Sequence, residues 1–131
     1  MHNPKVDWCF HTEKDETMNN RSIRYPRGKT LGGSSSINGL LWIRGQSNDY
    51  DNWRQQGNSG WGWDDVFPYF LKSENNELGP NEFHNDKGPI TVSNKKINLD
   101  MLEEFQNAAE ETGIPRTDDF NTGDNFGIGY F

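Results

Sequence analysis

The stretch from residue 27 to residue 39 restricts the fold of this chain more than any other part of the sequence. Two adjacent glycines run directly into three serines at residues 32–36, and an apolar segment follows. Glycine allows positive φ angles and close approach to a ligand, while serine is among the strongest helix N-caps. We therefore expect a glycine turn that leads into a short helix over about 35–42. The free N–H groups of such a helix start favour a phosphate or another electron-rich group, so a cofactor is expected here.

Two common nucleotide-binding motifs are absent. Residues 28–30 spell Gly-Lys-Thr, the end of a phosphate-binding P-loop, but that motif needs a glycine where the chain has Ile23. The Gly-x-Gly-x-x-Gly fingerprint of dinucleotide-binding folds occurs nowhere in the chain, since Gly57, Gly60 and Gly62 lack its spacing. A Gly-Gly-Ser-Ser turn is unspecific by itself, so a longer pattern is needed to assign a cofactor.

A longer pattern around these glycines resembles a known enzyme family. Its matching positions are Gly28, Lys29, Leu31, Gly32, Gly33, Ser34, Ser35, Ile37 and Asn38, followed by Trp42, Gly45 and Asp51. The pattern is similar to the first signature of the glucose–methanol–choline (GMC) oxidoreductases, which are FAD-dependent alcohol oxidases and dehydrogenases. Further similar segments lie at 7–13, 44–53, 60–70, 88–92 and 119–127. The likeness covers nearly the whole chain and is greatest to the choline-dehydrogenase-like branch.

The resemblance implies a mixed α/β fold within a longer enzyme. It predicts that about 1–75 belong to the FAD-binding Rossmann-like domain, with the signature loop at 28–51, and that about 76–131 begin the substrate-binding domain. Family members open with a Gly-x-Gly-x-x-Gly unit for the ADP half of FAD and end with a catalytic His plus a second His or Asn. We therefore expect an internal fragment near the N-terminal part, which is inactive alone, with its catalytic His beyond residue 131.

The resemblance also assigns cofactor-binding positions, all in or just after the glycine-rich stretch. It implies that residue 30 leads into the flavin site, that 33 and 34 approach the ribityl–pyrophosphate part, and that 38–41 line the isoalloxazine ring through backbone groups. The predicted residues are Thr30, Gly33, Ser34, Asn38, Gly39, Leu40 and Leu41. N–H groups aimed at the flavin stabilise the negative charge that arrives with a hydride. Some members attach FAD covalently through a His just before the Asn, but this chain has Ile37, which predicts non-covalent FAD.

The implied function is oxidation of the CH–OH group of an alcohol to a carbonyl, with hydride transfer to flavin N5. The implied partners are FAD, a small-molecule alcohol and the remainder of the parent chain. An alternative is a non-enzymatic, aromatic-rich module that binds carbohydrate or protein. Only 31% of the residues are hydrophobic, yet there are 5 Trp and 8 Phe. Many large rings with few aliphatic residues suit a segment that packs against a bigger protein.

The charge and the cysteine content indicate which classes of partner are disfavoured and which cellular compartment is favoured. The net charge of −7 disfavours nucleic acid and anionic membranes as partners. Cys9 is the single cysteine, which excludes an internal disulfide and suits a reducing compartment. We expect no metal site, because residues 119–124 resemble a calcium loop but have Gly123 at a ligand position. The expected location is cytoplasmic, with the parent enzyme peripheral to the inner membrane.

Hydrophobic spacing and cap residues predict three further helices and one strand. A helix is expected to begin near 47 or 48 and to stop at Gly57, and another to begin with Asp64 as N-cap and to tolerate Pro68. Residues 89–93 read as a strand. The clearest helix covers 99–112, with Asn98 as a cap and Gly113 as its stop. Residues 14–24, 75–88 and those from 117 onward are expected to be loops.

Several residues invite catalytic interpretations for which structural roles are better supported. The three histidines are far apart in polar segments, and we expect them to be structural or exposed: His2, His11 and His84. Four tryptophans resemble a sugar-stacking platform, but core packing is the favoured interpretation: Trp42, Trp53, Trp61 and Trp63. Four carboxylates lie at expected helix starts, where capping and dipole roles are favoured: Asp49, Asp51, Asp64 and Asp65.

Overall fold

The computed structural model describes residues 3–94, 96 and 99–130. The chain divides into two compact units, Met1–Leu41 and Trp42–Phe131. Helices and short strands occur together along it, as the expected mixed α/β class requires. The predicted functional boundary near residue 75 is a different division from this one, because strand residues 74–76 pair with 90–92 inside the second unit. That functional boundary stays a prediction.

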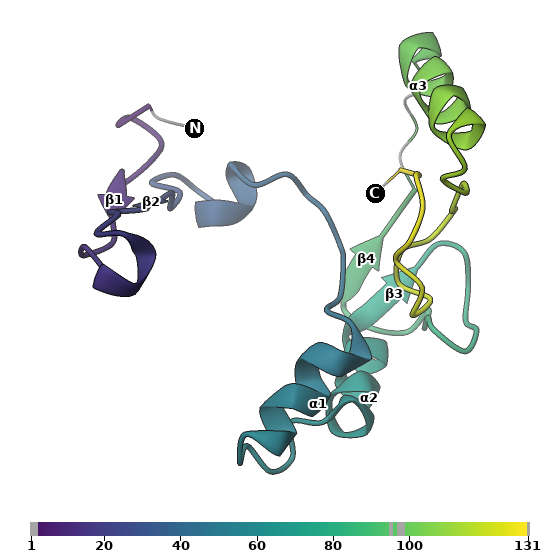
Figure 1. The fold of residues 1–131 in the computed structure, drawn as a ribbon, viewed down its shortest axis with the longest axis horizontal. Coiled ribbons are helices and arrows are strands. Elements are labelled where there is room, and N and C mark those ends of the chain that lie inside the picture. The colour runs from purple at the N-terminus through teal and green to yellow at the C-terminus, as the bar shows by residue number, and fades with distance from the viewer. Residues whose placement is uncertain (1–2, 95, 97–98, 131) are drawn as a thin grey trace. The chain divides into compact units, whose positions relative to one another are not determined.

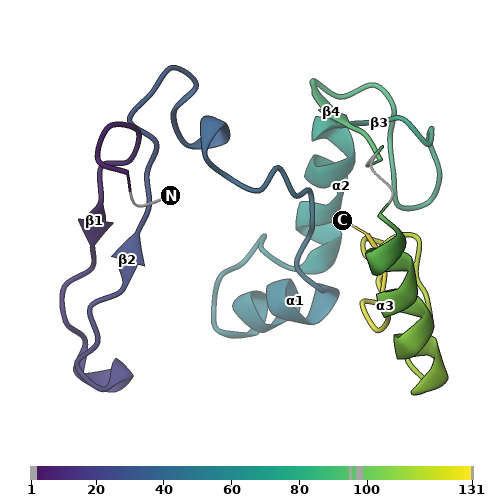
Figure 2. The same cartoon turned by 90° about the horizontal axis from the view of Figure 1, so that it is seen from above.

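The first unit contains a long antiparallel hairpin (Figure 2). Strand β1 (Phe10–His11) pairs with strand β2 (Arg24–Tyr25). A bridge between Asp7 and Gly28 extends the ladder to the start of the glycine-rich stretch. Asp7 is 1% exposed, and its carboxylate accepts a hydrogen bond from the backbone N–H of Arg27 at 3.1 Å. The hairpin thus ties the beginning of the glycine-rich stretch to a buried carboxylate.

The polar segment 14–24, predicted as a surface loop, forms the turn of this hairpin. It contains a short 3-10 helix, η1 (Glu16–Met18), which Asp15 caps. The Asp15 carboxylate accepts hydrogen bonds from the hydroxyl and the backbone N–H of Thr17 at 2.6 and 2.8 Å. The bond from the hydroxyl is the main cause that lowers the pKa of Asp15 below its ordinary value, and the backbone bond acts in the same direction. Apart from η1 and residue 24 in β2, the loop prediction is confirmed.

In the second unit, helices α1 (Ser47–Gln55) and α2 (Trp63–Ser73) lie against each other (Figure 1). The prediction for α1 is confirmed, including its end, where Gly57 has a φ of +100°. The prediction for the start of α2 is wrong by two residues. Gly62 is the N-cap, and the Asp65 carboxylate accepts a hydrogen bond from its N–H at 3.0 Å. A carboxylate at the third helical position reaches back to the cap residue, which allows the helix to begin before Asp64.

A small parallel sheet follows α2. Strand β3 (Glu74–Asn76) pairs with strand β4 (Ile90–Val92), and Glu74 lies opposite Ile90. The predicted strand over 89–93 is confirmed, whereas the predicted loop over 75–88 is wrong at its start because β3 occupies 74–76. Gly88 lies so close to the start of β3 that a Cβ there would be 2.4 Å from the backbone nitrogen of Glu74. A glycine is therefore required where the connection returns to the sheet.

Helix α3 (Asp100–Glu111) confirms the clearest prediction made from the sequence. The structure has Leu99 as its N-cap, and the predicted cap Asn98 lies outside the described residues. Gly113 ends the helix with a φ of +88°, and the chain from residue 117 is a loop, as predicted. Arg116 returns to α3 and pairs with Glu103 and Glu110, each at 2.7 Å. These two hydrogen bonds, Glu103 first, raise the pKa of Arg116 above its ordinary value.

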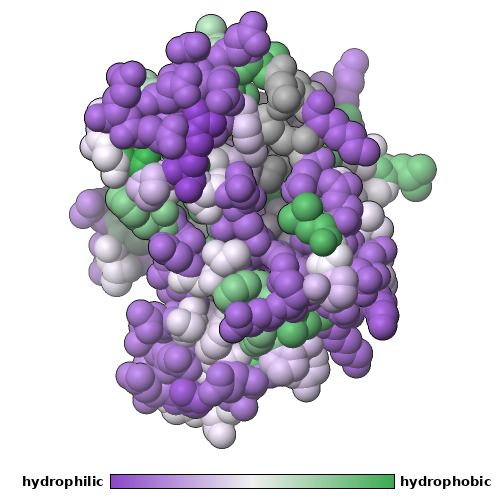
Figure 3. All heavy atoms as spheres, turned by 90° about the vertical axis from the view of Figure 1, so that its right-hand side faces the viewer, coloured by the Kyte–Doolittle hydropathy of each residue, from purple (hydrophilic) through white to green (hydrophobic). Residues whose placement is uncertain are grey.

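The buried residues of the described chain are polar rather than hydrophobic. No hydrophobic side chain among them is buried, and the buried side chains are Asp7, Arg44, Glu74, Asn76, His84 and Gln106. Figure 3 shows hydrophobic atoms open on the surface among hydrophilic ones. Within the described ranges, no helix has the length and apolar character needed to cross a membrane. Most globular domains bury their aliphatic residues, so these units expose surface that is usually covered.

Three tryptophans of the second unit pack against other rings but are not buried: Trp53, Trp61 and Trp63. Trp53 makes an edge contact with Trp61 at a centroid distance of 5.8 Å, and Trp63 stacks on Phe67 at 4.9 Å. Trp53 and Trp61 nevertheless remain 46% and 53% exposed. The prediction of core packing is therefore wrong for these two residues. Their rings meet one another, but no second layer of the described chain covers them.

Candidate functional site

The predicted helix over about 35–42 is wrong in length and type. The glycine-rich stretch forms a 3-10 helix, η2 (Gly33–Ser36), and the chain then continues without helical structure. Leu40 has a φ of +56°, a left-handed conformation that a right-handed helix cannot include. Asn38 favours this bend, because its side-chain oxygen accepts a hydrogen bond from the N–H of Leu40 at 2.9 Å. An Asn-centred turn thus replaces the predicted helix.

The glycine-rich stretch closes on itself at its base. The Gly28 N–H donates to the hydroxyl of Ser34 at 3.2 Å, and the Gly33 N–H donates to the carbonyl of Thr30 at 2.8 Å. A Cβ at Gly28 would lie 2.0 Å from the carbonyl oxygen of Gly33. No side chain fits there without displacing backbone, so a glycine at residue 28 is required by the loop itself.

The serine hydroxyls hold this loop from within. Ser35 and Ser36 donate to the carbonyls of Gly32 and Leu31, each at 2.7 Å. With the hydroxyl of Ser34 engaged at the base, all three serines use their side chains on the loop's own backbone. Any ligand of this loop would therefore meet mainly backbone groups, which is the kind of contact expected for a flavin.

The predicted cofactor residues near the start of the loop lie around η2. The carbonyl of Ser34 accepts hydrogen bonds from the N–H groups of Ile37 and Asn38 at 3.1 and 3.0 Å. Gly33 has a φ of +60°, and nothing lies within 4 Å of a Cβ built there. The backbone beside Gly33 therefore faces open space that a ligand can occupy.

The segment 38–41 offers unused backbone donors on an exposed surface. In the described part of the chain, the N–H groups of Gly39 and Leu41 donate to no hydrogen-bond acceptor. Leu40, between them, is 81% exposed. A Cβ at Gly39 would touch only Leu41, at an ordinary 3.8 Å, so the loop's own structure does not require this glycine. This segment therefore offers open donors beside apolar side chains to a flat ligand with a polar edge.

Three of the four acidic residues near the helix starts have the predicted structural roles, while Asp64 lies in the first turn of α2. Asp49 accepts a hydrogen bond from the N–H of Gln46 at 2.8 Å. Asp51 accepts from the N–H of Trp63 at 3.0 Å and pairs with Arg54 at 2.9 Å. Capping of α1 and α2 therefore accounts for these carboxylates, together with Asp65. In the described ranges, no group of three His, Cys, Asp or Glu side chains is arranged to hold a metal ion.

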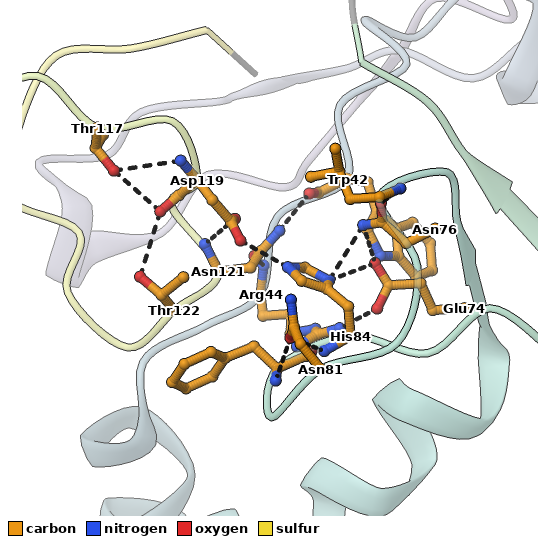
Figure 4. Close-up of polar contacts among 12 residues, drawn as sticks. Trp42, Arg44, Glu74, Asn76, Asn81, His84, Thr117, Asp119, Asn121 and Thr122 are labelled. Carbon is orange, nitrogen blue, oxygen red and sulfur yellow. Dashed lines mark hydrogen bonds and ion pairs between the residues drawn. The ribbon is translucent and has the colours of Figure 1, made fainter.

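A buried polar cluster in the second unit has no local signal in the sequence (Figure 4). Arg44 pairs with Glu74, a partner 30 residues away. His84 lies between two carboxylates, with Nδ1 at 3.0 Å from Glu74 and Nε2 at 2.6 Å from Asp119. Glu74 and His84 are 0% and 3% exposed. Opposite charges compensate one another in such an interior, and these pairings depend on the tertiary fold.

The predicted structural role is thus confirmed for His84, which is buried in this cluster. His11 belongs to β1 and is exposed, as predicted. His2 lies outside the described residues.

The chain is similar to known flavoenzymes in sequence. The family model described as GMC oxidoreductase matches residues 12–131. The mitochondrial choline dehydrogenase of Mus musculus is 39% identical over 126 residues, which cover 96% of this chain and 21% of that protein. The oxygen-dependent choline dehydrogenase of Pseudomonas savastanoi pv. phaseolicola is 41% identical over 127 residues, which cover 95% of this chain and 22% of that protein. The chain therefore spans about a fifth of the length of these relatives.

Solved structures agree with the sequence matches. Pyridoxine 4-oxidase from Mesorbium loti superposes with a TM-score of 0.75 at 29% identity, over 93% of this chain and 24% of that one. An FAD-dependent oxidoreductase from Chaetomium thermophilum also gives a TM-score of 0.75, at 30% identity over 96% of this chain and 24% of that one. Because the family model covers nearly all of the chain and these structures share its fold, the chain belongs to the GMC oxidoreductases, a family of FAD-dependent enzymes with choline dehydrogenases among its members.

Proposed function

We propose that this chain is the flavin-facing part of an enzyme that oxidises the CH–OH group of an alcohol to a carbonyl. The observation that carries the proposal is the open backbone of residues 38–41, where the N–H groups of Gly39 and Leu41 have no acceptor in the described chain. Similarity to choline dehydrogenases supports a choline-type alcohol as the substrate class. Bound FAD supplies the hydride acceptor, flavin N5.

The residues of this chain contribute positioning and charge stabilisation. The N–H groups at 39 and 41 act as fixed donors for negative charge that develops on the bound ring system, and fixed donors need no reorganisation during the reaction. Leu40 and Leu41, which are 81% and 58% exposed in this structure, would supply apolar side chains to a bound flavin and keep water away from it. Earlier in the loop, Thr30 would lead into the flavin site, and Gly33 and Ser34 would hold the ribityl–pyrophosphate part.

The proposal includes non-covalent FAD. Ile37 occupies the position from which some family members attach the flavin through a histidine, and its alkyl side chain has no nucleophilic atom. The proposal also places the catalytic His and the binding of the ADP half outside these 131 residues, in the remainder of a longer enzyme. In that enzyme, the residues from about 76 to 131 would begin the substrate-binding domain.

The proposed location of the enzyme is cytoplasmic and peripheral to the inner membrane. The single free cysteine, Cys9, suits a reducing compartment.

A glycine-to-alanine pair tests the flavin assignment in the enzyme that carries this segment. Gly39→Ala introduces a Cβ that the described structure tolerates, but that the proposed flavin would meet. We expect the Kd for FAD to rise about tenfold or more, the cost of overpacking a close contact. The thermal unfolding of the apo-enzyme should stay unchanged. FAD binding is measured by fluorescence quenching on titration of the apo-enzyme.

Gly28→Ala is the matched comparison, because its Cβ would collide with the backbone of Gly33 at 2.0 Å. This variant should lose FAD affinity and also alter the apo-enzyme, since the loop itself must shift. Wild-type affinity in Gly39→Ala would show that the flavin does not approach residue 39.

A further inference from the structure

The side chain of Asn121 binds the backbone directly downstream of residues 38–41 (Figure 4). Its Nδ2 donates to the carbonyl of Trp42 at 3.0 Å, and its Oδ1 accepts from the N–H of Arg44 at 2.9 Å. One amide thus satisfies a carbonyl and an N–H two residues apart, as a neighbouring β-strand does. The contact joins positions 77 and 79 residues apart in sequence.

Asn121 is itself held from the buried cluster. Its N–H donates to Oδ1 of Asp119 at 2.7 Å, and the other oxygen of Asp119 lies 2.6 Å from Nε2 of His84. The hydroxyl of Thr117 donates to the carbonyl of Asp119 at 3.0 Å. A side chain that is anchored at its base loses less entropy when it binds, so this amide is preorganised for residues 42–44.

Polar contacts join five residues into a closed ring, here called the circuit: Asn121, Asp119, His84, Glu74 and Arg44. Nδ1 of His84 lies 3.0 Å from Glu74, and Glu74 pairs with Arg44, whose N–H Asn121 binds. Nδ1 also lies 3.1 Å from the amide nitrogen of Asn76, which donates to Glu74 at 3.0 Å. A protonated Nδ1 donates to Glu74, and an unprotonated Nδ1 accepts from Asn76. In both cases Nδ1 keeps a hydrogen-bond partner, while Nε2–H donates to Asp119.

We propose that Asn121 is a positioning residue that fixes the chain where it enters the flavin-facing segment, residues 38–41. The inference rests on the proposed function, which makes residues 38–41 the flavin-facing segment. Residues 42–44 act on that segment because Leu41 is bonded directly to Trp42. Asp119 and His84 act through Asn121 by holding it in place. Small displacements of groups that face a reacting centre slow a reaction strongly, so loss of the amide should affect the hydride-transfer step.

Hydrogen–deuterium exchange on the apo-enzyme tests the contact without any flavin. Asn121→Leu keeps the size of the side chain but removes both hydrogen bonds, and it should speed exchange in peptides over 42–46 about tenfold. Peptides over α3 should exchange as in the wild type. Thr122→Val is the matched control from the same loop, because within the described residues its hydroxyl donates only to the carbonyl of Asp119, at 3.4 Å. It should leave exchange over 42–46 unchanged.

Two variants of His84 test how Asn121 is held. His84→Phe removes both polar contacts and should speed exchange over 42–46. His84→Gln offers a donor to Asp119 and an acceptor to Asn76, so it should restore slow exchange. Unchanged exchange in Asn121→Leu overturns the proposal. Failure of His84→Gln to exchange more slowly than His84→Phe overturns the circuit.

The flavin-loaded enzyme supplies the second measurement. At equal FAD occupancy, Asn121→Leu should slow stopped-flow flavin reduction by alcohol about tenfold, while Thr122→Val reduces at the wild-type rate. Faster exchange together with an unchanged reduction rate overturns the positioning role. A wild-type enzyme that holds no FAD instead contradicts the proposed function, and the exchange result then still decides whether Asn121 holds residues 42–44.

Discussion

At the scale of single residues, Asn38 has a more specific role than its sequence context indicates. The family resemblance places Asn38 among residues that line the isoalloxazine ring through backbone groups, and the structure adds a role for its side chain, whose oxygen accepts a hydrogen bond from the N–H of Leu40 at 2.9 Å. This bond supports a left-handed Leu40, which costs a non-glycine residue free energy without such support. The bend in turn leaves the N–H groups at 39 and 41 open. Asn38 therefore determines which way the segment 38–41 presents its donors.

Replacement of Asn38 in the parent enzyme should separate this role from folding. Asn38→Leu removes the acceptor for Leu40, and we expect a loss of about 1–3 kcal/mol in the local arrangement. Flavin reduction should slow about tenfold or more, since ~1.4 kcal/mol corresponds to a factor of ten. Asn38→Ser retains a short acceptor that can form the same turn, so it should reduce flavin faster than Asn38→Leu. Anaerobic stopped-flow reduction at equal FAD occupancy measures both, and equal rates in all three proteins would leave Asn38 without a role in hydride transfer.

The sequence was sufficient to predict which residues form the candidate site but not how their backbone is arranged. The run of glycines and serines marks residues 28–38, because consecutive glycines and serines favour close turns and helix starts. The closure of Gly28 on Gly33 and the open N–H groups depend on φ angles that no local pattern specifies. The circuit around His84 was not predictable at all, because its members lie on separate segments of the second unit. Residue type alone does not reveal which partner a buried charge will find.

At the scale of elements, the sequence correctly predicted the helices whose ends are determined by nearby residues. Helices α1 and α3 end at glycines with φ values of +100° and +88°, and both ends were predicted from the sequence. Strand β3 was missed because its sequence, Glu-Asn-Asn, has low strand propensity, and the strand forms by parallel pairing with the distant β4. The helix predicted over about 35–42 does not form as expected, because Leu40 adopts a left-handed conformation that interrupts it.

Two arginines connect elements in the second unit, and burial should separate their effects on stability. Arg44 is 6% exposed and pairs with a fully buried Glu74. Arg44→Met leaves that carboxylate without its guanidinium, which should cost about 3–5 kcal/mol. Arg116 ties the tail to α3 through glutamates whose side chains are 54% and 47% exposed. Arg116→Met should therefore cost less than about 1 kcal/mol.

Urea unfolding of the apo-enzyme, compared at equal m-values, measures both arginine variants. Similar losses for the two variants would mean that burial does not determine how much the Arg44–Glu74 pair contributes to the free energy of unfolding. The comparison is matched, because each substitution removes a guanidinium and keeps a flexible apolar side chain.

At the scale of the whole molecule, the distribution of burial determines what this chain can do alone. Apolar burial is the main stabilising term in folding, and no hydrophobic side chain in the described chain is buried. Leu31 is 97% exposed and Met101 is 82% exposed. The relatives are about five times as long as the segment they share with this chain. We expect the remainder of a parent enzyme to cover these side chains and to complete the core that the two units lack.

The 131 residues expressed alone should therefore neither retain FAD nor oxidise alcohols. The sequence has no Gly-x-Gly-x-x-Gly unit for the ADP half of FAD, and its buried His84 is enclosed by carboxylates instead of facing a substrate. The exposed apolar side chains should bind a fluorescent hydrophobic dye strongly. Gel filtration with added FAD, followed by absorbance of the protein peak and dye-linked assays with choline and simple alcohols, measures the outcome. Flavin that co-elutes with the segment, or dye reduction by it, would show that the loop at 28–41 suffices for binding, and the need for a separate ADP-binding unit would have to be abandoned.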